Sequence, residues 1–94
     1  MREGVIDSSG NVFLDLGYPP DEAAILQMRA TLLADLRQFL SAKRLGPARA
    51  AKLLRISPAR ATDLIGGRWE KFSLEMLVVL ATRAGMQVSV KTAA

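Results

Sequence analysis

The chain contains neither cysteine nor histidine among its 94 residues. Disulfide bonds are therefore impossible, and the usual zinc ligands are missing. Catalysis by a Ser-His-Asp or Cys-His arrangement is excluded too, because both need histidine. The remaining residues offer no carboxylate pair spaced for glycoside hydrolysis and no glycine-rich phosphate loop. The sequence therefore predicts that the protein is not an enzyme and holds no metal or cofactor.

Long hydrophobic runs are lacking as well. No run approaches the roughly 18 apolar residues that cross a bilayer, and the first eleven residues have no apolar core of a secretory signal. The absence of disulfides suits a reducing compartment. We therefore expect a cytoplasmic protein without membrane contact. A chain of 94 residues forms one domain, whose small core favours association with a second copy.

Negative charge is scarce in the middle of the chain. Residues 36–71 carry nine Lys and Arg residues against Asp63 and Glu70, a net charge of +7. Residues 1–35 have a net charge of −4 and residues 72–94 one of +1, which gives +4 for the chain. One concentrated basic block is typical of nucleic-acid-binding proteins, although a solvated basic surface has the same composition.

Prolines, glycines and serine N-caps divide most of the chain into helices. Proline favours the first turn of a helix, Ser57 and Ser73 suit the N-cap position, and Gly66 and Gly85 suit helix ends. Between these signals the apolar residues recur at spacings of three and four, which is the helical period. The predicted fold is all-α with about five helices, of which four cover residues 20–42, 47–54, 58–65 and 74–84.

The two ends of the chain are predicted to differ from this helical pattern. Residues 1–19 read as an irregular arm with a short extended segment at 12–16, and residues 86–91 alternate like a short β-strand. A lone strand is unstable, so its mate is either residues 12–16 or the same strand of a second copy. The C-terminal part is therefore the predicted dimerisation surface, with the residues Leu77, Met86, Val88 and Val90.

Two of the predicted helices are short and joined by only three residues, which makes a helix-turn-helix unit at 47–65 within a domain of residues 20–94. Ala51 is small enough for the close crossing of the two helices, and Ile56 is an apolar plug after the turn. Ala61 and Leu64 face inward, one turn apart. The second helix is then free to enter the major groove of DNA.

Several further motifs follow one another in a specific order. They lie at residues 11–17, 29–30, 50–54, 56–57, 60, 63–65, 67–68, 72–74 and 84–88. In this order they resemble the Xre-type helix-turn-helix regulators, and more narrowly their small antitoxin-like branch, found beside ribosome-targeting RNase toxins. The resemblance implies a phage-repressor-like bundle. It also implies a transcriptional repressor that binds a palindromic operator in double-stranded DNA as a homodimer.

The chain departs from the family pattern at three places. The family usually has Thr-Gln where this chain has Gly46-Pro47, and a glycine where Arg55 stands. A left-handed backbone at Arg55 is expected to cost about 1 kcal/mol. Polar residues usually read bases where Pro58 and Ala59 stand. These departures predict intact phosphate binding with little direct base readout.

Arg60 is the expected principal DNA contact, because arginine reads guanine and also clamps phosphate. Arg68 is expected to bind a phosphate, while Arg49 and Lys52 either bind phosphates or keep their helix face solvated. Asp63 fits a helix salt bridge or a fixed hydrogen bond better than a contact that accepts a hydrogen bond from cytosine. The predicted DNA-binding residues are Arg49, Lys52, Ser57, Pro58, Ala59, Arg60, Thr62, Asp63 and Arg68.

Two further interpretations concern protein contacts. Trp69, the only tryptophan, is either an interface anchor or, as we favour, a loop residue folded over the core beside Phe72. The resemblance also implies an alternative function as an antitoxin that neutralises a small basic RNase toxin by direct contact. The acidic residues 1–35 suit such a partner.

Overall fold

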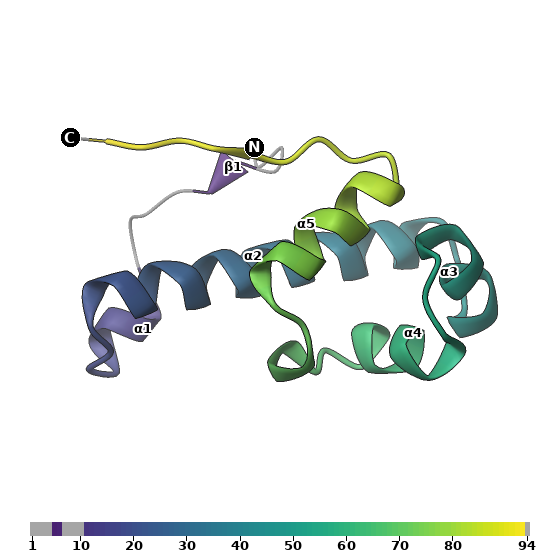
Figure 1. Cartoon of the computed structure of the whole chain (residues 1–94), viewed down its shortest axis with the longest axis horizontal. Helices are drawn as coiled ribbons and strands as arrows, with labels where there is room; N and C mark the ends of the chain where they lie inside the picture. Colours follow the sequence, from purple (N-terminus) through teal and green to yellow (C-terminus); the bar gives the residue numbers. More distant parts are fainter. Residues whose placement is uncertain (1–4, 7–10, 94) are drawn as a thin grey trace.

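A single helix of 23 residues runs the length of the molecule, and the other elements gather around it (Figure 1). The computed structural model describes residues 5–6 and 11–93. The long helix is α2, Pro20–Ala42. The remaining elements are β1 (Val5–Ile6), α1 (Val12–Asp15), α3 (Pro47–Leu54), α4 (Pro58–Ile65), the 3₁₀ helix η1 (Trp69–Lys71), α5 (Leu74–Arg83) and β2 (Ser89–Val90).

The predicted helices at 20–42, 47–54 and 58–65 are confirmed with the same bounds, and α5 ends one residue early. Local chemistry explains this agreement. Three of these helices begin with a proline at the first position, where the missing N–H costs nothing. The hydroxyl of Ser57 accepts a hydrogen bond from the Arg60 N–H, and that of Ser73 accepts one from Met76.

The extended segment predicted at residues 12–16 is wrong, because this stretch forms helix α1. Asn11 is the N-cap, and its side-chain oxygen accepts hydrogen bonds from the N–H groups of Phe13 and Leu14. Its side-chain amide also donates to Ala23 O at 3.0 Å, which ties α1 to the start of α2. Capping by one asparagine therefore outweighs the strand preference of the Val-Phe-Leu sequence.

One of the two mates that we predicted for the C-terminal strand, residues 12–16, is also wrong, while pairing with a second copy stays a prediction. Of residues 86–91 only Ser89–Val90 form strand β2, and it pairs in parallel with β1, Val5–Ile6. The register places Val5 beside Ser89 and Ile6 beside Val90. Residues 12–16 could not serve because they are helical, so the chain's first described residues take that place.

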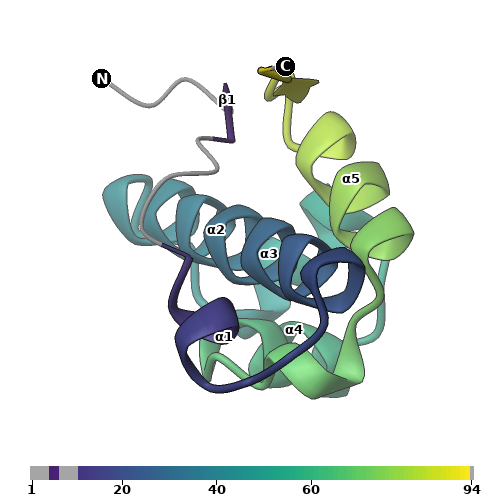
Figure 2. The same cartoon turned by 90° about the vertical axis from the view of Figure 1, so that its left-hand side faces the viewer.

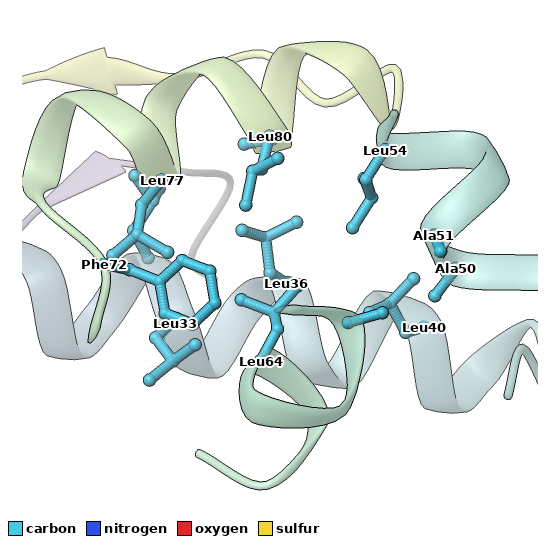
Figure 3. Close-up of a cluster of buried hydrophobic side chains, with 13 residues drawn as sticks. Leu33, Leu36, Leu40, Ala50, Ala51, Leu54, Leu64, Phe72, Leu77 and Leu80 are labelled. Carbon is cyan, nitrogen blue, oxygen red and sulfur yellow. The ribbon is translucent and has the colours of Figure 1, made fainter. Parts of the chain in front are cut away.

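The core lies where α2, α3, α4 and α5 meet. Figure 3 shows Leu36 of α2 near its centre, between Leu80 of α5 and Leu64 of α4. The buried apolar side chains come mostly from leucine and alanine, which pack without strain in helices. The cluster comprises Leu32, Leu33, Leu36, Leu40, Ala50, Ala51, Leu54, Ala61, Leu64, Phe72, Leu77, Leu80 and Ala81.

Figures 1 and 2 place α4 and the strands on opposite sides of α2. In both views α4 lies below α2, while β1 and the C-terminal segment lie above it. Helix α5 packs on α2, and α3 packs on α4. The second helix of the helix-turn-helix unit, α4, is therefore separated from the strand pair by the long helix.

The turn between α3 and α4 contains a strained residue. Arg55 has φ 60° and ψ 46°, the left-handed conformation predicted for it. A side chain at this position costs about 1 kcal/mol relative to glycine. Replacement of Arg55 by glycine should therefore raise the free energy of unfolding by about 0.5–1 kcal/mol, after allowance for the freer unfolded chain. Urea denaturation measures the change.

Lys52→Gly is the matched control, since it removes the same charge from an exposed position inside α3. Glycine within a helix costs about 1 kcal/mol, so this variant should lose stability. Equal losses in both variants would mean that Arg55 carries no backbone strain.

Candidate nucleic-acid interface

The helix-turn-helix unit is held together by small and apolar side chains at the crossing of α3 and α4. Ala51, Ala61 and Leu64 are buried there, as predicted, and Leu54 is buried with them. The chain turns sharply after α3, where the Ile56 N–H donates to Ala51 O at 3.0 Å. The two helices therefore have a fixed relative orientation, which is what a helix must have to enter a groove reproducibly.

The first turn of α4 presents small side chains to solvent. Ser57, Pro58, Ala59 and Thr62 are all exposed. The Thr62 hydroxyl donates to Pro58 O at 3.0 Å, so its oxygen keeps lone pairs for an outside donor. Pro58 and Ala59 can make only apolar contacts, such as with a thymine methyl group. This face can approach DNA closely, but it offers few groups for reading bases.

Exposed basic residues also lie on α3, the helix that packs on α4. Arg49 and Lys52 lie on its exposed surface, three residues apart. Within the described part of the chain neither side chain forms an ion pair or a hydrogen bond with another residue. Both cations are therefore available to an external anion such as a phosphate.

Arg60 is the residue for which we expected the principal DNA contact, and the structure places its guanidinium against the chain itself. Its Nη1 donates to Lys71 O at 3.1 Å. Its Cζ lies 4.4 Å from the centroid of the Phe72 ring, a cation–π distance. The side chain thus bridges α4 and η1 across eleven residues of sequence.

Asp63 forms the ion pairs that we favoured for it. Its two carboxylate oxygens lie 3.9 Å from Arg68 Nε and 3.9 Å from Lys71 Nζ. The two cationic side chains are 64% and 49% exposed, so solvent screens both pairs and each contributes little stability. Arg68 and Lys71 therefore remain able to bind a phosphate. Lys71 was not among the predicted site residues, although it belongs to the basic block.

Trp69 lies in η1 rather than in a plain loop. It is 38% exposed, and the Arg29 guanidinium lies 5.0 Å from the centroid of its ring. Arg29 also donates to Trp69 O at 3.0 Å and to Phe72 O at 3.1 Å. This role of Arg29 could not be predicted from the sequence, where it only formed part of a family motif, because its partners lie about 40 residues away.

Two further arginines have a role that the sequence did not reveal, since each donates to the carbonyl end of a helix. Arg37 Nε binds Ile65 O at the end of α4, at 3.0 Å. Arg83 Nη1 binds Leu54 O at the end of α3, at 2.9 Å. Carbonyls in the last turn of a helix lack partners within the helix, and a cation there also suits the helix dipole. Part of the basic charge is thus used inside the domain.

The predicted dimerisation residues fall into two groups. Leu77 is fully buried in the chain's own core (Figure 3), which leaves it no surface for a second copy. Met86 and Val88 are half-buried, and Val90 is 56% exposed. Val79 of α5, which we did not select, is 41% exposed.

Two searches of the described residues gave negative findings. None of the helices there is long and apolar enough to span a membrane. Residues 5–6 and 11–93 also contain no group of three or more His, Cys, Asp or Glu residues placed to hold a metal ion.

Comparison with known proteins agrees with this geometry. A family model described as a helix-turn-helix domain matches residues 12–93. The match therefore covers α1, α2, the helix-turn-helix unit, η1, α5 and β2. Searches of the curated proteins and of the solved structures gave no significant match.

Proposed function

The chain belongs to the helix-turn-helix domain family, and we propose that it is a transcriptional repressor that inserts α4 into the major groove of its operator. The observation that carries the proposal is the arrangement of charge around α4. The small exposed side chains of its first turn stand between two neighbouring elements with exposed cations: α3, which packs on α4 and carries Arg49 and Lys52, and the η1 segment, whose Arg68 and Lys71 pair with Asp63 of α4. A slim helix face between two basic borders suits a groove between two phosphate backbones.

The basic side chains and the small side chains of α4 contact different parts of the DNA. The four basic residues bind phosphates and supply most of the affinity, which makes binding strongly dependent on salt. Ser57, Thr62 and the apolar Pro58–Ala59 pair make the contacts to base edges. Because few of these can form bidentate hydrogen bonds, discrimination rests on thymine methyl contacts and on the shape of the groove.

A homodimer on a palindromic operator is part of the proposal. The exposed edge of β2 and the apolar residues Val79 and Val90 support it, since together they offer strand pairing and apolar burial to a second copy. Met86 and Val88 would extend that surface.

A salt titration tests the proposed function. We expect tight binding to duplex DNA from upstream of the protein's own gene, with two chains per site, and at least ~10³-fold weaker binding to a shuffled duplex. Two copies with four phosphate contacts each should give a slope of log K against log salt of about −7. Fluorescence anisotropy measures both quantities. Equal, weak binding to both duplexes would contradict a sequence-specific regulator.

One observation favours a second candidate function, neutralisation of a basic protein such as an RNase toxin. Exposed apolar side chains gather on α1 and the start of α2, where the charged neighbours Asp15, Asp21 and Glu22 are all acidic. Such a surface complements an apolar patch with a basic rim. Co-purification with the product of the adjacent reading frame tests this candidate. The exposed apolar residues are Val12, Leu14, Leu16, Tyr18 and Ile25.

A further inference from the structure

The short helix η1 is held to the domain by two guanidinium groups. The Phe72 N–H donates to Trp69 O at 3.1 Å, and the carbonyls of Lys71 and Phe72 lie past this turn, where η1 has ended. Arg29 of α2 donates to Trp69 O and Phe72 O, and Arg60 of α4 donates to Lys71 O, all between 3.0 and 3.1 Å. Each carbonyl thus has a charged donor, the stronger class of hydrogen bond.

Arg60 is the more constrained of the two connections. Its guanidinium stacks over Phe72, and this ring is itself 1% exposed and part of the core. The stacking and the hydrogen bond to Lys71 O act on adjacent residues at the end of η1. The side chain therefore fixes the distance between α4 and η1, and it uses its charge inside the domain.

The two basic residues around η1 depend on this connection. Arg68 precedes η1 and Lys71 ends it, and the carboxylate of Asp63 on α4 lies 3.9 Å from both. These ion pairs are too exposed to fix η1 by themselves. The Arg68 N–H also donates to Asp63 O at 3.0 Å, which joins the start of η1 to the end of α4. Arg60 and Arg29 hold the other end of η1, so the position of both cations relative to α4 depends on these contacts together.

We propose that Arg60 is a positioning residue that sets η1 so that Arg68 and Lys71 meet the phosphate backbone while α4 lies in the groove. This inference rests on the proposed DNA-binding function. It differs from the expectation that Arg60 itself reads a base. A base reader gives sequence preference, whereas a positioning residue gives affinity for all sequences through other side chains.

The test uses Arg60→Ala and Arg60→Lys, with duplex DNA from upstream of the gene and its shuffled version as probes. Arg60→Ala should weaken binding to both duplexes by a similar factor, about tenfold or more, so that the preference between them changes less than threefold. The slope of log K against log salt should become shallower by the equivalent of about two phosphate contacts for each chain, although the substitution removes only one charge. Arg60→Lys keeps the charge but lacks the planar fork, so it should behave like Arg60→Ala.

Two controls separate positioning from a general loss of structure. Arg60→Ala in a background that already carries Arg68→Ala and Lys71→Ala should cause little further loss, because the side chains it positions are gone. The fluorescence of Trp69, the only tryptophan, should change in both Arg60 variants without DNA. It should stay constant in Arg49→Ala, which removes an exposed charge from α3. Circular dichroism checks that each variant is folded.

The outcomes distinguish the inference from the proposed function. A collapse of sequence preference in Arg60→Ala, with unchanged Trp69 fluorescence, would overturn the inference and identify Arg60 as a base reader. A second outcome would show that Arg60 contacts a phosphate directly. In that case Arg60→Lys would bind as strongly as the wild type, and the salt dependence of Arg60→Ala would correspond to the loss of only one phosphate contact for each chain. Failure of the wild-type protein to bind either duplex would remove the proposed function and the inference with it.

Discussion

Truncation of Leu36 to alanine should lower the free energy of unfolding by about 3–5 kcal/mol. Leu36 is fully buried near the centre of the core, where side chains from α4 and α5 surround it (Figure 3). Removal of its branched end loses the transfer free energy of the methyl groups and leaves a cavity that helices packed on several sides cannot fill. A domain of this size has only about 5–10 kcal/mol of stability, so the loss is a large fraction.

Urea denaturation followed by circular dichroism measures the effect, and the melting temperature should fall by at least about 12 °C. Ile25→Ala is the matched control, because Ile25 lies on the same helix with 49% of its surface exposed. That variant should stay within about 1 kcal/mol of the wild type. A loss below about 1 kcal/mol in Leu36→Ala would contradict the packing of α2 against α4 and α5.

The positions of the helices could be predicted because local signals set them. Proline at the first helical position and serine at the N-cap act within a few residues, and these signals bound α3 and α4 in the sequence as in the structure. The left-handed turn at Arg55 was expected on another ground, the glycine that the resembling family has at this position. The predicted and observed helix boundaries agree because each capping residue or proline lies within a few residues of the boundary that it sets.

The errors at the two ends of the chain have different causes. At α1 the Val-Phe-Leu sequence favours a strand, but the single side chain of Asn11 supplies two capping hydrogen bonds and reaches Ala23 as well. At β2 the pairing joins residues more than 80 positions apart. Alternation of apolar residues indicates that a strand exists, but it carries no information about which segment pairs with it.

The composition of the site was predictable, and the use of its charges was not. The basic block contains Arg37 and Arg60, and a count of charges along the sequence treats both residues as available to bind an external anion. In the structure both guanidiniums donate to carbonyls of the chain, over separations of 28 and 11 residues. Which arginines meet a helix end depends on how the helices cross. The charge left for DNA is therefore smaller than the count suggests, and it borders α4 rather than covering it.

This arrangement gives the largest expected effect on DNA binding to a change at Ala59, an exposed residue in the first turn of α4. Ala59→Glu should weaken binding to duplex DNA at least about 100-fold, because a carboxylate between two phosphate backbones is repelled and loses its hydration. The stability of the domain should change by less than about 0.5 kcal/mol, since the site is exposed and an acid suits the first turn of a helix.

Ala24→Glu is the control, as it makes the same substitution at an exposed position of α2 on the acidic end of the molecule. Anisotropy titrations of both variants at one salt concentration give the comparison, and urea denaturation verifies their folding. Only Ala59→Glu should lose affinity, because the added charge in Ala24→Glu lies far from α4 and is screened beyond about 10 Å at 0.1 M salt. Equal losses in the two variants would show that binding responds to net charge alone. α4 would then not be the element that enters the groove.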